Sequence, residues 1–496
     1  MIEFSRLFKL GIPLIWVSLL FLSSNAEAQK IARDTLVTIK QDTLPGRVVT
    51  INRVLIIGNK ITKERIISRE LSLRPGDTVS TKRIDNILVL DQRKIYNLRL
   101  FNTVTIQWLE LSPDEVDLLV EVNERWYTFP VPIFELSDRN FNEWWQNYDH
   151  DLRRVNYGLR LYQYNFRGRN ETLRFTAQFG FTRKFDLSYR IPYIDKQQRH
   201  GLVIDFNYGE PKNLAYFTDD HKLRFFPEDK PSETTVKLSR GFGVSYTFRK
   251  SFYETHSLSF SYQNNRVIDS IALKNPNYYG NSKTQQQYSS ITYTFNSEHR
   301  DVIAYPLKGY QITAFAQRTG LLIDSDVQQW ELNLTYSKYA DLGSNNYLSN
   351  FTSLYLSAPS DQPYSFYSAL GYRRQFVKGY EVYVIEGPKF FLNKTTFRKR
   401  IFSRTWQMEY MPIEQFRYLP LAIYLKGYFD MGYVENYPYY ESYQPKPINT
   451  QLTNRMLIGT GAGLDIVTSY DAVLRLEYTF TREKTHGFFF HMKKEF

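Results

Sequence analysis

Residues Thr172 to Phe181 read TLRFTAQFGF, and this stretch decides the fold class. Every second position is apolar: Leu173, Phe175, Ala177, Phe179 and Phe181. Because successive side chains of a β-strand point to opposite faces, the stretch is predicted to form a strand with one apolar and one polar face. The same period recurs in WELNLTYSK (330–338) and LRLEYTFTR (474–482), and no convincing helical pattern follows Trp126.

Strand length and loop length separate a membrane barrel from a soluble β-sandwich, which has the same period. Residues 126–496 divide into sixteen predicted strands, from 129–136 to 486–496. Most are near the roughly ten residues that a tilted membrane strand needs. Short connections such as RGRN alternate with long ones such as 210–235 and 359–401. Since lipid cannot satisfy an open sheet edge, a spanning sheet has to close. The predicted fold is mainly β, a 16-stranded antiparallel transmembrane β-barrel over residues 126–496.

A small domain of mixed structure precedes these strands. Over residues 47–125 the pattern runs strand, helix, helix, strand, strand. VVTINRVLIIG has strand character, whereas Ile84, Leu88 and Ile95 mark one face of a helix. Thr62 is the expected N-cap of the first helix. The sequence therefore predicts one small α+β domain of β-α-α-β-β order.

The N-terminus has the features of an export signal. Two basic residues precede an apolar run of 13 residues, LGIPLIWVSLLFL, and Ala26 and Ala28 supply the small residues of a cleavage site. The run is too short for a membrane-spanning helix. We therefore expect residues 1–28 to be a cleaved signal peptide and residues 29–46 to be a short polar tail.

The composition narrows the class of partners. The chain has no cysteine and a formal net charge of +12, with Lys and Arg spread over its whole length. A secreted soluble protein often uses disulfides, so stability is expected to come from the ladder hydrogen bonds of a closed barrel. Dispersed basic charge suits anionic lipid head groups better than nucleic acid. Membrane lipids are the predicted surface partner, and no nucleic acid is expected.

The sequence contains none of the common catalytic or metal-binding motifs. It has no G-x-S-x-G, no H-E-x-x-H and no Cys, and its seven histidines are scattered without metal-like spacing. A serine hydrolase assembled from distant loop residues is the enzymatic alternative left open. We expect no enzymatic activity, no metal and no cofactor.

Four motifs resemble those of the BamA/TamA superfamily, the bacterial surface antigen family of outer-membrane insertases and two-partner secretion transporters. VKGYEVYVIEGP (377–388) resembles the family's VRGF/VRGY loop signature, and HRDVIAYPLKGY (299–310) resembles its turn between the eighth and ninth strands. GYFDMGYV (427–434) and GTGAGLDI (459–466) resemble its strands thirteen and fourteen. Their glycines let a strand bend or let a loop pack against the wall.

The resemblance covers nearly the whole chain after the signal. Residues 47–125 resemble a single POTRA domain, the periplasmic module of that family, and residues 126–496 resemble its sixteen-stranded barrel. The turn motif within the 299–310 stretch comprises Asp301, Pro306 and Gly309.

The resemblance also implies a loop that folds into the barrel lumen. Its motif residues in this chain are Val377, Lys378, Gly379 and Tyr380. Lys378 stands where relatives have arginine, and since lysine cannot form the planar bidentate fork, a less fixed clamp is expected. Its candidate salt-bridge partners are Glu409 and Asp430, because a cation inside the lumen needs a partner. A solvated loop lysine is the alternative interpretation.

Two prolines fall in the first predicted strand. Pro130 and Pro132 each remove a ladder donor. The first strand must pair with the last, which ends at Phe496, to close the barrel. We therefore expect a seam that is poor in hydrogen bonds, at which a client strand could add. The alternative is that both prolines lie in a linker before the membrane.

These features predict an outer-membrane β-barrel assembly or insertion factor of BamA/TamA type in a Gram-negative bacterium, with its POTRA domain in the periplasm. The predicted partners are outer-membrane lipids, unfolded β-barrel client proteins, and periplasmic chaperones or accessory assembly subunits. An edge strand within TVTIQWLE (103–110) is expected to accept a client or partner strand, with Trp108 as plain core being the alternative. The alternative function is a two-partner-type secretion pore that exports a dedicated polypeptide. A single POTRA module and the short 29–46 tail count against it.

Overall fold

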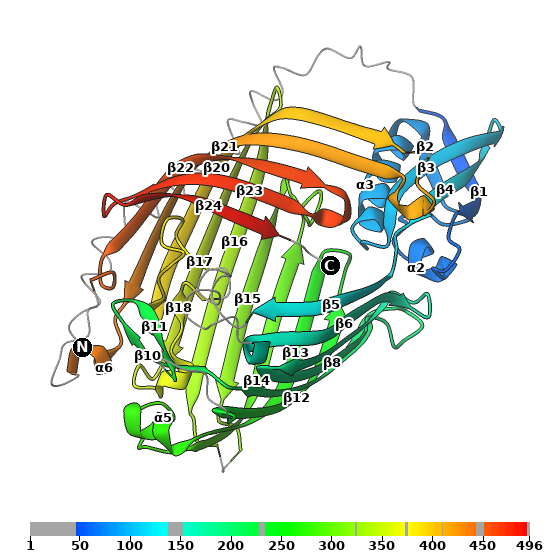
Figure 1. Cartoon of the computed structure of the whole chain (residues 1–496). Coiled ribbons are helices and arrows are strands. Elements are labelled where there is room, and N and C mark those ends of the chain that lie inside the picture. The colour runs from blue at the N-terminus through cyan, green and yellow to red at the C-terminus, as the bar shows by residue number, and fades with distance from the viewer. Residues whose placement is uncertain are drawn as a thin grey trace.

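The computed structural model describes residues 46–136, 152–227, 234–322, 325–372, 375–408, 410–442 and 451–493. The predicted signal peptide, Glu409 and Phe496 lie outside these ranges. Within them the chain forms a small α+β domain followed by one large antiparallel sheet that curves into a barrel (Figure 1). None of the helices in these ranges has the length and hydropathy of a membrane span.

The small domain contains a four-stranded sheet and two helices. Its elements are β1 (Val48–Ile57), α2 (Glu64–Ser68), β2 (Thr78–Ser80), α3 (Thr81–Tyr96), β3 (Phe101–Ser112) and β4 (Glu115–Glu124). The sheet order is β2-β1-β4-β3, with β1 and β4 parallel. Ile84, Leu88 and Ile95 of α3 are buried in its core, at the predicted helical spacing. The predicted order of elements is confirmed, apart from the short β2, which pairs with β1 between the helices.

Thr62 does not cap the first helix, contrary to the prediction. Lys63 occupies the N-cap position of α2, and the Thr62 side chain is buried. Its hydroxyl donates to Glu124 Oε1 at 2.5 Å and accepts a bond from Asn165 Nδ2 at 2.8 Å. Since Glu124 ends β4 and Asn165 belongs to the barrel, tertiary partners take the hydroxyl that a local cap would use.

Sixteen strands form the large sheet, the number that the sequence predicts. In chain order they are β5 (Thr128–Leu136), β6 (Val155–Phe166), β7 (Glu171–Gly180), β8 (Thr182–Ile191), β9 (His200–Pro211), β12 (Lys237–Arg249), β13 (Glu254–Val267), β14 (Gln285–Glu298), β15 (Gly309–Thr319), β16 (Gln329–Gly343), β17 (Asn346–Ala358), β20 (Lys389–Gln407), β21 (Tyr418–Glu435), β22 (Met456–Thr468), β23 (Val473–Thr481) and β24 (His486–Lys493). Each pairs with its neighbours in this order. Over the described residues no ladder joins β5 to β24, and we call the place where these end strands face each other the seam (Figure 1).

The connections at the two ends of the barrel differ in length, as predicted. At the end next to the small domain they are short. At the opposite end they carry further elements: β10 (Leu214–Asp219), β11 (Lys222–Phe226), α5 (Asp269–Lys274), β18 (Ala369–Leu370), β19 (Ile385–Glu386) and α6 (Pro438–Ser442). The described ranges also contain four 3-10 turns: η1 (Leu152–Arg154), η2 (Tyr364–Phe366), η3 (Glu414–Phe416) and η4 (Ser469–Asp471).

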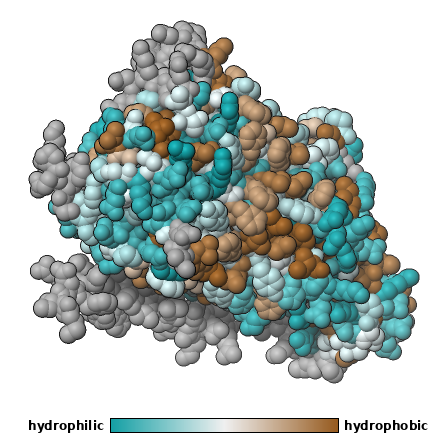
Figure 2. All heavy atoms as spheres, turned by 90° about the horizontal axis from the view of Figure 1, so that it is seen from below, coloured by the Kyte–Doolittle hydropathy of each residue, from teal (hydrophilic) through white to brown (hydrophobic). Residues whose placement is uncertain are grey.

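Apolar side chains cover the outside of the wall. Exposed examples from four strands are Phe175 of β7, Leu187 of β8, Phe206 of β9 and Leu258 of β13. Figure 2 shows apolar residues gathered across the middle of one face, with hydrophilic residues on either side. A band of this kind is what a bilayer requires of a barrel that spans it.

The loop predicted over residues 359–401 is shorter than expected. β20 begins at Lys389, so the connection from β17 spans residues 359–388. The inward-facing Phe390 and Leu392 are apolar because they pack against this loop. The outward-facing Asn393 is polar. The start of β20 therefore lacks the apolar-out, polar-in alternation on which the strand prediction depended.

Candidate functional site

The connection between β17 and β20 folds back into the barrel, and we call residues 359–388 the lumenal loop. Val377 and Tyr380 are buried in one cluster with Val434 of β21 and Leu457 of β22. Gly379 has a φ of +89°, a conformation that side chains other than glycine rarely adopt. The VKGY motif is therefore a turn inside the barrel and not a strand of its wall.

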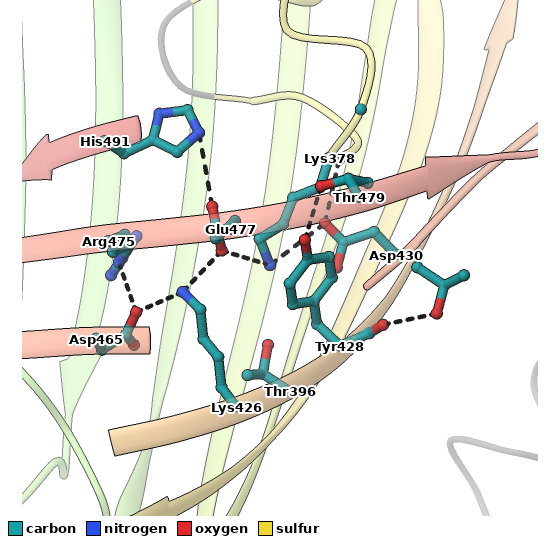
Figure 3. Close-up of polar contacts among 12 residues, drawn as sticks. Lys378, Thr396, Lys426, Tyr428, Asp430, Asp465, Arg475, Glu477, Thr479 and His491 are labelled. Carbon is teal, nitrogen blue, oxygen red and sulfur yellow. Dashed lines mark hydrogen bonds and ion pairs between the residues drawn. The ribbon is translucent and has the colours of Figure 1, made fainter. Parts of the chain in front are cut away.

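Lys378 lies between two buried carboxylates (Figure 3). Its Nζ is 3.7 Å from Asp430 Oδ2 on β21 and 3.7 Å from Glu477 Oε1 on β23. Its backbone N–H donates to Asp430 Oδ2 at 3.3 Å. The ammonium also lies 3.9 Å from the centre of the Tyr428 ring, a cation–π distance. Since 12% of the Lys378 side chain and none of the Asp430 side chain is exposed, the group is a buried ion cluster and not a solvated pair.

A chain of opposite charges continues from Glu477. Lys426 Nζ is 2.7 Å from Glu477 Oε1 and also pairs with Asp465. Asp465 is 3.8 Å from Arg475 and accepts a 2.9 Å hydrogen bond from the Tyr305 hydroxyl. Because the signs alternate, each buried charge has a partner, which the low dielectric of the interior requires. We call the following residues the lumenal charge cluster: Lys378, Lys426, Asp430, Asp465, Arg475 and Glu477.

The last strand also contacts this cluster. His491 of β24 places Nε2 3.6 Å from a carboxylate oxygen of Glu477 and 3.6 Å from one of Glu381. Its ring stacks on Phe376, with centroids 5.7 Å apart. Since Phe376 and Glu381 belong to the lumenal loop, the loop contacts the strand that borders the seam.

Two glycines of the wall leave room for the loop. A Cβ at Gly459 of β22 would lie 1.9 Å from the Lys378 carbonyl oxygen. A Cβ at Gly432 of β21 would lie 2.5 Å from Val377 Cγ2. Gly427, on the same strand as Gly432, has its nearest such atom at 3.9 Å. Of the two uses that the sequence suggests for these glycines, Gly432 and Gly459 serve close packing of the loop.

The turn between β14 and β15 is built on Asp301. Its Oδ1 accepts N–H bonds from Val302 at 2.8 Å and Leu307 at 3.0 Å, which closes the turn around Pro306. Gly309 has a φ of +100°, and a Cβ there would lie 2.0 Å from a backbone oxygen of the same turn. The three predicted motif residues thus lie together in one tight turn.

The small domain is held against the barrel at several such turns. Asn97 Nδ2 donates to the Asp301 carbonyl oxygen at 3.1 Å, and Arg249 donates two bonds to Glu70, at 2.7 and 2.9 Å. Further hydrogen bonds join Thr62 to Asn165, Arg65 to Gln198, Asn102 to Gln415 and Arg125 to Asp471. These contacts involve six turns that belong to both halves of the sheet, so the domain lies across this mouth of the barrel.

Pro130 and Pro132 lie on the free edge of β5. Tyr164 N donates to the Tyr127 carbonyl oxygen at 2.7 Å, and the register of β5 with β6 runs without a shift from Thr128 to Leu136. Facing pairs of an antiparallel ladder alternate between bonded and non-bonded. The backbone of residues 128, 130, 132, 134 and 136 therefore faces the seam. Both prolines are inside the strand, at positions whose N–H would point into the seam.

Contacts among the long connections tie the opposite mouth together. Glu386 is buried and accepts hydrogen bonds from the hydroxyls of Thr218, Tyr372 and Tyr440. Burial raises the pKa of Glu386, although these hydroxyls favour its charged form. Leu452 N donates to His221 Nε2 at 3.0 Å, and burial lowers the pKa of His221. We call the following residues the outer cap: Thr218, His221, Tyr372, Glu386, Tyr440 and Leu452.

The sequence pointed to one neighbour of Lys378 and missed the others. Asp430 lies beside Lys378, whereas Glu409 is outside the described residues. Glu477 and Lys426 were not predicted. Glu477 is on the polar face of LRLEYTFTR, and a charged residue on the polar face of a membrane strand is the signal that could have identified it.

Comparison with known proteins assigns the family. The profile of the Omp85 superfamily domain matches residues 165–496, and the POTRA profile, the surface antigen variable number repeat, matches residues 49–125. The chain belongs to the Omp85 superfamily. This membership confirms the predicted family. Omp85 proteins are outer-membrane β-barrel proteins that act in protein insertion or transport. With the POTRA domain on the periplasmic side, the six turns mark the periplasmic mouth and the outer cap faces outward.

Two solved structures are similar to this Omp85 protein at low sequence identity. CdiB from Escherichia coli aligns over 90% of this chain and 75% of its own, with a TM-score of 0.51 at 9% identity. BamA from Haemophilus ducreyi lacking POTRA domains 1–3 aligns over 90% and 82%, with a TM-score of 0.46 at 14% identity. The likeness to CdiB concerns the fold alone. Among curated proteins, none matches this sequence.

Proposed function

We propose that this Omp85 protein assembles or inserts outer-membrane β-barrel proteins, with the POTRA domain receiving client or partner strands and the seam templating insertion. The seam carries the proposal, because over the described residues its two strands, β5 and β24, have no ladder between them. Each unsatisfied backbone group in hydrocarbon costs several kcal/mol. An edge left open in a membrane therefore suits a protein that offers it to an incoming strand.

The prolines lower the cost of that open edge. Five residues of β5 face the seam, and two of them are Pro130 and Pro132, which leaves three N–H donors. Fewer N–H donors need a partner while the seam is open. If the seam closed, β24 would form fewer hydrogen bonds with β5. Both effects favour exchange of one edge partner for another.

The POTRA domain offers a second edge. β3 is an outer strand of the POTRA sheet, as the sequence predicts for TVTIQWLE. Trp108 packs partly against the core and its Nε1 donates to Asp85 at 3.1 Å, so it serves the domain itself. The backbone of β3 would receive the strand of a client, a periplasmic chaperone or an accessory subunit by β-augmentation.

A pore that exports one dedicated polypeptide is the alternative, and it needs a clear lumen. Three obstacles lie along that path. The lumenal loop is fixed by the lumenal charge cluster, the POTRA domain is held at six turns, and the outer cap joins the external connections. A path through the seam avoids all three, which favours insertion over export.

Depletion of the protein in its own bacterium tests the proposal. If it is an assembly factor, several unrelated outer-membrane barrels should decline together when the membrane proteome is quantified, and a plasmid copy should restore them. A dedicated transporter would instead abolish export of one polypeptide and leave the barrels at normal levels. That second outcome would overturn the proposal.

A further inference from the structure

A cavity of about 310 Å³ lies in the lumen between the lumenal loop and the inner face of the wall. We call it the lumenal cavity. Phe376 and Lys378 line it from the loop, and strands from β16 to β24 supply its other sides. Besides His491, its charged lining residues are Lys378, Lys394, Arg398, Lys426, Asp465, Arg475 and Glu477. Five cations face two carboxylates, so the lining has a surplus of positive charge.

Two carboxylates beside the lining do not remove this surplus. Asp430 pairs with Lys378. Glu381 lies 3.6 Å from His491 Nε2 and accepts the Gly379 N–H at 2.7 Å. With both included, four carboxylates face five lysine and arginine side chains. The positive charge in excess therefore lies on the far side of the cavity from these two acids, among the wall residues.

Lys394 of β20 has no counter-charge within ion-pair distance among the described residues. Its ammonium lies 4.2 Å from the centre of the Phe376 ring, and none of the described residues forms a hydrogen bond with it. Asp430 is its cross-strand neighbour on β21, yet the carboxylate of Asp430 pairs with Lys378. Because a ring compensates an ammonium less well than water or a carboxylate does, Lys394 is suited to an anion in the cavity.

Two arginines beside Lys394 have unused donors. The Nε groups of Arg398 and Arg475 are buried without a hydrogen-bond partner in the part of the chain that is described. Both lie near Asp465, at 3.7 and 3.8 Å, which is beyond hydrogen-bond distance. That carboxylate already serves Lys426 and the Tyr305 hydroxyl (Figure 3). Since buried N–H groups are nearly always bonded, these two indicate an acceptor other than the side chains around them.

One kind of ligand meets both requirements. A water molecule would accept the two N–H bonds but would leave the charge of Lys394 unbalanced. A tetrahedral oxyanion carries charge and has several acceptor oxygens, and guanidinium groups bind such oxygens strongly. The Thr396 hydroxyl lines the same space and can donate a further bond. The lining therefore favours an oxyanion such as phosphate.

We propose that the lumenal cavity binds an inorganic oxyanion of the phosphate class, held by Lys394, Arg398 and Arg475. This site does not depend on the assembly function proposed above. All three side chains belong to the wall, whereas Lys378 and Phe376 belong to the lumenal loop and line the same cavity. An anion between them attracts both sides, so its binding stabilises the loop in the lumen.

Thermal unfolding of the purified full-length protein in detergent, followed by tryptophan fluorescence, tests the site. Phosphate replaces chloride at constant ionic strength, so that the screening of surface charges stays the same. A ligand of the folded state raises the midpoint with the logarithm of its concentration. Once the site is saturated, we expect a rise of about 1–2 °C for each tenfold increase in phosphate.

Two lysines on β20 give matched variants. Lys394→Met should abolish the phosphate dependence and should raise the midpoint in chloride, because it removes a cation that lacks a counter-charge. Lys389→Met is the same substitution on the same strand outside the lining, and it should retain the dependence. Equal midpoints of the parent in phosphate and chloride would overturn the inference, and so would a dependence that Lys394→Met retains. If Lys394→Met does not fold, dialysis of the parent against labelled phosphate decides, with one ion bound per chain expected and none overturning the site.

A lipid head group carries the same phosphoryl chemistry, and a second arm of the experiment distinguishes the two sources. Short-chain phosphatidic acid takes the place of phosphate. Because the cavity lies inside the wall, the free ion should raise the midpoint at a lower concentration than the lipid does. A rise with the lipid at an equal or lower concentration would overturn the assignment of a free ion.

Discussion

Lys378 shows how a single ammonium can serve two acids. Its Nζ is equally far from Asp430 and Glu477, at 3.7 Å, which is longer than a charge-assisted hydrogen bond. A guanidinium would direct separate N–H groups to each carboxylate. Lysine therefore holds the lumenal loop mainly by charge, by the Tyr428 ring and by the backbone N–H of the turn, with less geometric constraint than arginine would impose.

Removing this charge should loosen the barrel. Lys378→Met leaves Asp430 and Glu477 buried with one positive neighbour fewer, and we expect a loss of about 3 kcal/mol of stability, as for one broken buried pair. Lys378→Arg should lose little. The matched control is Lys389→Met, whose pair with Glu435 is far more exposed and should cost under about 1 kcal/mol. The stability of the three variants is measured as the temperature at which the compact, SDS-resistant band is lost on a gel. Equal midpoints for Lys378→Met and Lys389→Met would contradict the buried cluster.

A methyl group on the wall should displace the loop. Gly459→Ala places a Cβ against the Lys378 carbonyl oxygen, and overpacking of this kind costs about 1–3 kcal/mol. The matched control is Gly427→Ala, which has space for its Cβ. The readout is disulfide formation between cysteines placed at positions 378 and 430, in a chain that has no other cysteine. We expect Gly459→Ala to slow the crosslink and Gly427→Ala to leave it unchanged. Equal rates would mean that the loop does not press on the wall.

At the scale of elements, the sequence predicted the strands better than their partners. Alternation predicts a strand wherever lipid lies outside and water inside, so all sixteen strands were found. It failed at the start of β20, where Phe390 and Leu392 face the packed loop instead of water. The pairing of Lys378 with Glu477 could not be predicted, because it depends on how the loop enters the lumen and on the register of β21 to β23. Asp430 was within reach because it belongs to a motif on one strand.

Restoring donors to the free edge of β5 should strengthen the seam. Pro130→Ala together with Pro132→Ala returns two N–H groups that face β24, each worth about 1 kcal/mol when bonded. We expect higher thermal stability and slower insertion of a client barrel into liposomes that contain the purified protein. Val131→Ala is the control, because its backbone already bonds β6. Unchanged stability and insertion would show that the prolines do not limit pairing at the seam.

The outer cap should open in acid through His221. Its Nε2 accepts the Leu452 N–H, which a protonated imidazole cannot do, and burial lowers its pKa. Above pH of about 6.5, the value in an open cap, the imidazole is neutral in both states and the closed cap has its full stability. As the pH falls through that value, only the open form takes up the proton, so the closed form loses stability. Glu386, whose pKa burial raises, acts in the opposite sense, because its closed form holds a proton at higher pH.

Labelling from outside measures this opening. A cysteine at the buried position 369 should react faster with an impermeant maleimide below that pH, relative to a cysteine at the exposed position 382. His221→Gln keeps an acceptor that cannot be protonated, so it should remove the acid response while leaving Glu386 in place. If His221→Gln opens with the same pH dependence as the parent, the histidine is not the group responsible.

At the scale of the whole molecule, the POTRA domain and the seam meet at one turn. Tyr470 and Asp471 both have positive φ, at 56° and 60°, which is rare for residues other than glycine and asparagine. Asp471 binds Arg125 at the end of the POTRA domain, and the Tyr470 ring contacts Phe129 at the start of β5. Backbone strain of this kind persists where surrounding contacts fix the turn. The turn thus couples the position of the POTRA domain to the periplasmic end of the seam.

A disulfide that locks the POTRA domain to the turn between β14 and β15 distinguishes a client path through the seam from a path through the lumen. Asn97 and Ile303 are in contact, with Ile303 N donating to Asn97 Oδ1 at 3.3 Å, so cysteines at these positions should form a disulfide. If clients enter the membrane through the seam, the oxidised protein should still insert a client barrel at the rate of the reduced one, because the lumen is not on their path. Each single-cysteine variant controls for oxidation itself.

The contrary outcome has two explanations. A loss of insertion on oxidation that reductant restores would mean that the periplasmic mouth must open, either for passage of the client through the lumen or for movement of the β22–β23 turn. Arg125→Ala in the locked protein decides between these two explanations, since it frees that turn from the POTRA domain and should restore insertion only if the turn has to move.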